Sequence, residues 1–160
     1  MEIIRIKEVM SAHPVMARPT QSVKEVAELM REHDCGVMPV GMPKQVLGIV
    51  TDRDITIRVT AEGKGARGPI EEVMTRHFIS CEENDTIEHA AELMRKHDVS
   101  RLLVSNGDEI TGIVSIADLL RNKDIRRESD KVLHELLGRK LRQAKQTIPQ
   151  SQIDILEEVL

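Results

Sequence analysis

The stretch GIVTDRD at residues 48–54 returns 64 residues later as GIVSIAD at residues 112–118. Each stretch runs from glycine through two apolar residues to a hydroxyl residue and then, three positions on, to an aspartate. The match continues outward without a gap, and residues 9–56 and 73–120 are identical at 15 of 48 positions. An internal repeat sets the unit of folding. Two copies predict two equivalent units that face each other across a pseudo-twofold axis, with a cleft between them.

Each copy predicts the order strand, helix, strand, strand, helix. In the first copy Ser22 and Glu25 have the spacing of a capping box, and apolar residues at helical intervals follow. Asn106-Gly107 between two apolar runs indicates a hairpin in the second copy. The closing helices are expected over about 52–59 and 116–121. Strands that alternate with helices in so short a unit predict an α/β fold, with the sheet on one side and the helices on the other.

The repeat suggests a division of the chain into four parts. These are a first repeat (1–60), a linker (61–68), a second repeat (69–122) and a helical C-terminal extension (123–160). The linker has three glycines but lacks the residue order of a phosphate loop, so we expect a flexible connector. The extension has an apolar stripe at helical spacing, so it is expected to pack on the repeats or on a second subunit.

The composition restricts the class of protein. The net charge of −4 predicts no general attraction to nucleic acid or to an anionic membrane, although a basic excess in the extension leaves a nucleic-acid contact as a minor alternative. We expect no membrane span, because no apolar run approaches about 18 residues. The start of the chain lacks the apolar core of a signal peptide, and a cytoplasmic protein with reduced Cys35 and Cys81 is expected. The spacing of cysteine and histidine predicts no zinc site.

The hydroxyl residue and the aspartate at the end of each repeated stretch have two interpretations, and the residues leave both open. Thr51 and Ser115 follow an apolar run, so they are suited to cap a helix while Asp54 and Asp118 complete a capping box. Alternatively, the same carboxylates face a cleft and accept hydrogen bonds from the vicinal hydroxyls of a ribose. The backbone N–H groups at such a helix start also favour a phosphate.

The pattern Gly-apolar-apolar-Thr/Ser-x-x-Asp in both copies resembles the cystathionine-β-synthase (CBS) domain, and two domains in tandem resemble a Bateman module. Val-Met-Ser/Thr at residues 9–11 and 73–75 and a strand containing Pro39 add to the resemblance, which covers about residues 3–122. It implies a three-stranded sheet and two helices per copy, with the two sheets packed together. It also implies two clefts that bind AMP, ADP, ATP or S-adenosylmethionine, and in some members cyclic dinucleotides or NAD(H).

The resemblance also implies site residues. Thr51 with Asp54, and Ser115 with Asp118, would hold the ribose hydroxyls. The strand stretches Val15–Ala17 and Ile79–Cys81 would line the two base pockets, together with Val37, Met38, Pro39, Leu102 and Leu103.

The two copies differ at positions close to these residues. Val37 is matched by Arg101, whose fork of N–H groups suits phosphate oxygens; the alternative is a surface arginine whose stem covers apolar neighbours. Arg53 is a second ligand-binding candidate, and Ala117 replaces it in the second copy. The two sites are therefore not expected to be equivalent. His13 and His77 match each other and are expected on surface loops.

The predicted function is regulation, and not catalysis, because no nucleophile has an identifiable base and orienting group beside it. We expect a sensor in which an adenine nucleotide binds in the cleft between the repeats and acts through conformational change. No resident cofactor is predicted. The expected partners are a second copy of the chain in a homodimer and an effector protein in trans. The alternative is a ligand-free dimerisation or interaction scaffold that acts through residues 123–160.

Overall fold

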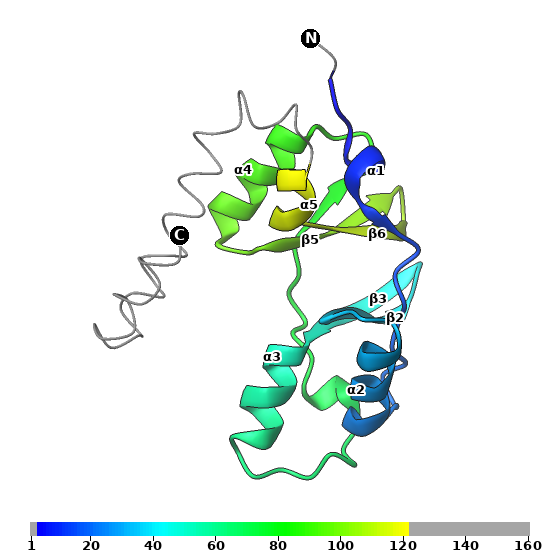
Figure 1. Ribbon diagram of the computed structural model, residues 1–160. Helices are drawn as coiled ribbons and strands as arrows, with labels where there is room; N and C mark the ends of the chain where they lie inside the picture. The colour runs from blue at the N-terminus through cyan, green and yellow to red at the C-terminus, as the bar shows by residue number, and fades with distance from the viewer. Residues whose placement is uncertain (1–2, 122–160) are drawn as a thin grey trace, which may run out of the picture.

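The computed structural model describes residues 3–121, so the predicted extension at 123–160 lies outside the described residues. Two units are visible in Figure 1, with their strands toward each other and their main helices on the outer sides. Within residues 3–121, no helix has the length and apolar character needed to cross a membrane.

The first unit is built around a hairpin. Its elements are α2 (Val23–Glu32), β2 (Val37–Met42), β3 (Gln45–Thr51), α3 (Asp52–Ile55) and the π-helical turn η1 (Thr56–Thr60). The strand expected at residues 15–17 is reduced to one parallel bridge, between Ala17 and Val40. The expected helix over 52–59 is present, but it changes from α to π geometry after Ile55.

The second unit has a four-stranded sheet in the order β1-β6-β5-β4, in which β1 is Ser11–Ala12. Its elements are β4 (Ser80–Glu82), α4 (Ile87–His97), β5 (Arg101–Asn106), β6 (Glu109–Ser115) and α5 (Ile116–Arg121). The strand β4 runs parallel to β5, and the β5–β6 hairpin turns at Gly107, whose φ of 61° is left-handed. This confirms the hairpin predicted from Asn106-Gly107, because glycine adopts that conformation without steric cost.

The helix α2 begins as the sequence predicts. The Ser22 hydroxyl accepts a hydrogen bond from the Glu25 N–H, and the Glu25 carboxylate accepts one from the Ser22 N–H. Hydrogen bonds from the Ser22 side chain and backbone lower the pKa of Glu25 below its ordinary value of 4.5. The contribution of this cap to stability is therefore present above pH 4.5 and is lost as the pH falls.

Both faces of the central strands are buried. In the second unit Leu102, Val104 and Val114 pack with the helices, while Leu103 and Ile113 point to the opposite face and are also buried. Because the helices cover only the outer face, this second buried face lies toward the other unit (Figure 1). The predicted α/β fold, with two repeats packed through their sheets, is confirmed.

The hydrophobic cores cross the boundary between the two sequence repeats. Ile6, which the sequence repeat assigns to the first copy, lies in the core of the second unit with residues such as Met94. Ile70, the equivalent residue 64 positions later, lies in the core of the first unit, together with Val73 and Met74. We call residues 6–12 and 70–76 the first and second crossing segments. The division of the chain at residues 60 and 69 follows the sequence repeat and stays a prediction.

Backbone hydrogen bonds fix the crossing segments. The strand β1 (Ser11–Ala12) of the first crossing segment pairs with β6, and α1 (Ile6–Val9) precedes it. In the second crossing segment, η2 (Ile70–Glu72) leads to Thr75, which exchanges two hydrogen bonds with Ile49 at 2.8 and 2.9 Å. Each unit is thus completed by a segment that precedes the other unit in the chain, as Figure 1 lets the reader follow.

The linker differs from the flexible connector expected for residues 61–68. The carbonyl groups of Ala66 and Gly68 accept hydrogen bonds, each 2.9 Å long, from the N–H groups of Lys24 and Val23. The first N–H groups of a helix have no partner within the helix, so the linker supplies two of the acceptors that α2 needs. The second half of the linker is therefore anchored on α2.

We predict that Gly48→Ala lowers the free energy of unfolding by about 1–3 kcal/mol, the cost of overpacking a tight contact. A Cβ atom at residue 48 would lie 2.6 Å from the backbone oxygen of Thr75 and 2.8 Å from Met74 Sδ. The Thr75 oxygen cannot move without disturbing its bond to Ile49. Urea denaturation measures the loss, with Gly65→Ala as the control because no atom lies within 4 Å of that site. Equal stability of the two variants would contradict the close contact.

Candidate functional site

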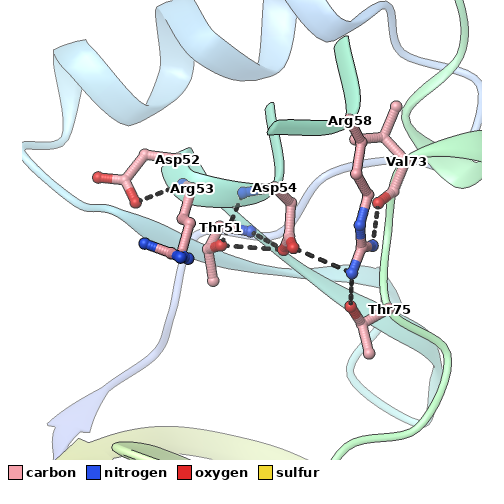
Figure 2. A network of polar contacts seen from close by, with 7 residues as sticks. All are labelled: Thr51, Asp52, Arg53, Asp54, Arg58, Val73 and Thr75. Carbon is pink, nitrogen blue, oxygen red and sulfur yellow. Dashed lines mark hydrogen bonds and ion pairs between the residues drawn. The ribbon is translucent and has the colours of Figure 1, made fainter. Parts of the chain in front are cut away.

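The end of β3 and the start of α3 form a closed ring of hydrogen bonds around Thr51 and Asp54. The Thr51 N–H and hydroxyl both donate to Asp54 Oδ2 at 2.9 Å, and the Asp54 N–H donates to Thr51 Oγ1 at 3.1 Å. Thr51 has the extended backbone of an N-cap residue, with φ −118° and ψ 161°. The capping interpretation is therefore confirmed for the first unit (Figure 2).

The second unit repeats this arrangement at Ser115 and Asp118. The Ser115 N–H and hydroxyl donate to Asp118 Oδ2 at 2.9 and 2.6 Å, and the Asp118 N–H donates to Ser115 Oγ at 3.3 Å. Both aspartate side chains are mostly buried, with 16% of Asp54 and 10% of Asp118 exposed. The two units thus hold equivalent carboxylates in equivalent orientations.

The remaining oxygen of each carboxylate faces an arginine. Asp54 Oδ1 lies 3.2 Å from an Arg58 nitrogen, and Asp118 Oδ1 lies 3.2 Å from an Arg121 nitrogen. An ionised carboxylate offers about four lone-pair positions. The cap uses two of them and the arginine one, so each aspartate keeps about one position for a further donor. A ribose that used both of its hydroxyls on one aspartate would have to share an acceptor with the arginine.

The register of the hairpins places the candidate residues on one face. Val37 lies opposite Thr51, and Arg101 lies opposite Ser115. Residues directly opposite each other in an antiparallel pair project to the same side of the sheet. Arg101 alternates with Leu102, so it shares the side of Leu103, which faces the other unit.

The two candidate arginines have no partners of their own in the described part of the chain. Arg101 and Arg53 are exposed, and neither guanidinium has a hydrogen bond or ion pair within residues 3–121. Figure 2 shows the Arg53 side chain extending past Thr51 with no contact drawn to its guanidinium. Arg101 in the second unit and Arg53 in the first are thus available to an anion.

Four of the residues expected to line base pockets have their side chains in the cores on the helix side. They are Ala17, Met38, Cys81 and Leu102, and none is more than 4% exposed. Contacts of these residues with a ligand between the units would therefore come from their main chain. Val15 and Ile79 are half-buried against the cores, Val37 is half-buried, and Pro39 and Leu103 are buried on the face toward the other unit.

The residues that alternate with the buried ones differ between the two units. Met16 precedes Ala17 and is half-buried, whereas Ser80 precedes Cys81 and is exposed. Ser80 lies beside Leu103 in the parallel pair of β4 and β5. Met16 and Ser80 both lie within the stretches expected to line the base pockets, and because successive side chains of an extended chain point to opposite sides, they are placed opposite Ala17 and Cys81. The same face is therefore more polar in the second unit, with Ser80 and Arg101, than in the first, with Met16 and Val37.

The cysteines are free thiols, as predicted. Burial, followed by the nearby charges of Asp85 and Glu82, raises the pKa of the Cys81 thiol to about 12. Burial also raises the pKa of Cys35. Because the thiolate is the reactive form, Cys81 has a packing role. His13 and His77 are exposed, as expected for loop residues, and no group of three or more metal-binding side chains occurs within residues 3–121.

Comparisons with known proteins agree with this geometry. The family model described as "CBS domain" matches residues 6–60 and 70–124. The CBS domain-containing protein YhcV of Bacillus subtilis is 35% identical over 118 residues, which cover 74% of this chain and 84% of YhcV.

The solved structures that are similar to the chain include two complexes with adenosine compounds. One is the CBS domain protein PAE2072 from Pyrobaculum aerophilum complexed with AMP, with a TM-score of 0.72 and 29% identity over 80% of this chain and 99% of that one. The other is the CBS domain pair of protein MJ0100 in complex with 5′-methylthioadenosine and S-adenosyl-L-methionine, with a TM-score of 0.67 and 30% identity over 75% of this chain and 95% of that one.

Proposed function

Because the chain belongs to the CBS domain family and carries two copies of the domain, we propose that it is a regulatory module that binds an adenine nucleotide between its units. The observation that carries the proposal is the pair of equivalent, mostly buried carboxylates, each held at the start of a helix by a hydroxyl residue. The solved complexes of PAE2072 with AMP and of MJ0100 with S-adenosylmethionine support the choice of ligand class.

The second unit is the better candidate for a phosphorylated ligand. Arg101 projects on the same side as Ser115, which is bonded to Asp118, and its guanidinium has no partner within residues 3–121. In the first unit the equivalent of Arg101 is Val37, and the available cation is Arg53. The two sites therefore differ in affinity for phosphate, with the second unit preferring AMP, ADP or ATP over an uncharged adenosine.

The proposed mechanism is a shift between conformations of the two units. A nucleotide that contacts both sheets binds best to one arrangement of the units, and it favours that arrangement by its difference in affinity. A homodimer and an effector protein would carry the change further, in keeping with a regulatory role and not a catalytic one.

The alternative is a ligand-free scaffold acting through residues 123–160. The observation that favours it is that the capping box and the arginine of each unit already use most of the acceptor positions of its aspartate.

We predict that AMP raises the thermal stability of the protein. A ligand at about 100 times its dissociation constant adds about 2.7 kcal/mol to the free energy of unfolding. The chain has no Trp or Tyr, so a co-purified nucleotide would dominate the absorbance near 260 nm and must first be removed. Thermal-shift and calorimetric titrations with AMP, ATP, S-adenosylmethionine and adenosine then measure binding.

The variant Arg101→Val, which copies the first unit, separates phosphate recognition from binding of the nucleoside. It is expected to weaken AMP binding about tenfold or more, since an ion-paired hydrogen bond contributes about 1.5–3 kcal/mol, and to leave adenosine binding unchanged. A ligand-free wild-type protein that none of these compounds stabilises would support the scaffold alternative.

A further inference from the structure

Arg58 connects the first candidate site to the segment that leads into the second unit. Its guanidinium pairs with Asp54 Oδ1 at 3.2 Å, and the same nitrogen, Nη2, donates to Thr75 Oγ1 at 2.9 Å. The other terminal nitrogen, Nη1, donates to the Val73 carbonyl at 2.6 Å. Figure 2 shows the side chain lying between Asp54 and the second crossing segment, with all three contacts drawn.

The Arg58 contacts lie at the end of the second crossing segment, just before the chain leaves the first unit. Thr75 is bonded to Ile49 on one side, and Met74 packs beneath Gly48. The chain then leaves the first unit and reaches β4 of the second unit at Ser80. Loss of the Arg58 contacts to residues 73 and 75 would therefore loosen the chain at the point where it passes from the first unit to the second.

The equivalent carboxylate in the second unit has a different partner. Arg121 pairs with Asp118 at the same distance of 3.2 Å, but its side chain is 77% exposed, against 41% for Arg58. Arg121 makes no hydrogen bond or ion pair to the first crossing segment within residues 3–121. The residue 64 positions after Arg58 is an asparagine. Among the described residues, the link between a candidate site and a crossing segment thus belongs to the first unit.

We propose that Arg58 is a positioning residue that couples ligand binding at Asp54 to the second crossing segment. The inference rests on the proposed function in one respect, namely that a ligand hydroxyl donates to Asp54. In the closed state, Thr75 is bonded to Ile49, and the Val73 carbonyl and Thr75 hydroxyl oxygens hold the Arg58 guanidinium where it orients Asp54. In the open state these contacts are lost, so Asp54 no longer has a fixed partner. A ligand that needs an oriented Asp54 therefore binds the closed state better and shifts the population toward it.

Amide hydrogen exchange of Ile49 and Thr75 tests the proposal, because each amide donates to the other residue across the closed segment. Saturating AMP is expected to slow exchange of both amides about tenfold or more in the wild-type protein, and less than about threefold in Arg58→Met. The matched control Arg121→Met is expected to keep the wild-type response at both amides. The proposal is overturned if Arg58→Met responds to AMP as the wild type does, or if Arg121→Met loses the response.

A second variant keeps the test valid if Arg58→Met is poorly folded. Thr75→Val preserves the volume of the side chain and the backbone bonds to Ile49 and removes only the hydroxyl that Arg58 contacts. It is expected to keep AMP affinity within about threefold of the wild type while reducing the AMP-induced protection of the Ile49 amide. Unchanged protection in Thr75→Val, with unchanged affinity, would contradict the coupling.

A hydrogen-exchange experiment on the free protein distinguishes failure of the coupling from failure of the proposed nucleotide binding. If AMP does not bind the wild-type protein, the proposed function fails, and the coupling is judged by Asp54→Asn in the free protein. That change is expected to speed exchange of the Thr75 amide several-fold when Arg58 is present and to have no further effect in an Arg58→Met background. Equal effects of Asp54→Asn in both backgrounds would overturn the coupling whether or not a nucleotide binds.

Discussion

Replacing Ile70 by Ala is expected to lower the free energy of unfolding by about 2–5 kcal/mol, the cost of truncating a large buried aliphatic side chain. Ile70 is fully buried in the core of the first unit, although the sequence repeat assigns it to the second copy. Ile6→Ala is expected to have an effect of the same size on the second unit, because Ile6 is fully buried in that core. Urea denaturation followed by circular dichroism measures both losses.

The location of each loss is the stronger test of the crossed cores. Ile70→Ala is expected to speed amide exchange first in β2 and β3, and Ile6→Ala first in β5 and β6. Ile57→Ala is the control, because that side chain is 46% exposed and its truncation should change stability by less than about 0.5 kcal/mol. If Ile70→Ala loosened β5 and β6 instead, the second crossing segment would belong to the unit that follows it.

The crossed arrangement was not predictable from the repeat, for a physical reason. The two crossing segments are close copies, with Val-Met at 9–10 and 73–74 and isoleucine at both 6 and 70. Either segment therefore presents nearly the same apolar surface to either core, and local pattern does not distinguish the two assignments. Only the path of the chain decides, and it connects each segment to one unit while packing it on the other.

Local features of the site were more predictable than long-range ones. The caps at Thr51 and Ser115 depend on contacts three residues apart, so the spacing in the sequence was sufficient to predict them. Arg58 was missed because its partners Val73 and Thr75 lie 15 and 17 residues away on the second crossing segment. The side of the sheet on which each apolar strand residue lies was also missed. A continuous apolar run that is buried on both faces has no alternation of polar and apolar residues, so it does not indicate which side chains point toward the helices.

Replacing each aspartate by alanine separates its role as a helix cap from its role in ligand binding. Asp54→Ala and Asp118→Ala are each expected to lower the free energy of unfolding by about 1 kcal/mol through loss of a cap, and to weaken adenine nucleotide binding in their own unit by tenfold or more. The second effect follows because a hydrogen bond to an ionised acceptor contributes about 1.5–3 kcal/mol, and about 1.4 kcal/mol corresponds to a tenfold change in affinity. Thermal denaturation and calorimetric titration measure the two effects separately.

Glu25→Ala supplies the matched control, because Glu25 completes a capping box of the same kind at the start of α2. It is expected to lower stability through loss of the cap and to leave nucleotide affinity unchanged. If all three variants bound AMP with the wild-type affinity, the aspartates would be helix caps alone. We expect Asp118→Ala to weaken the binding of AMP more than that of adenosine, and Asp54→Ala to weaken the binding of both ligands equally. That result would show that the ribose and phosphate contacts depend on each other in the second unit, where Arg101 lies opposite Ser115.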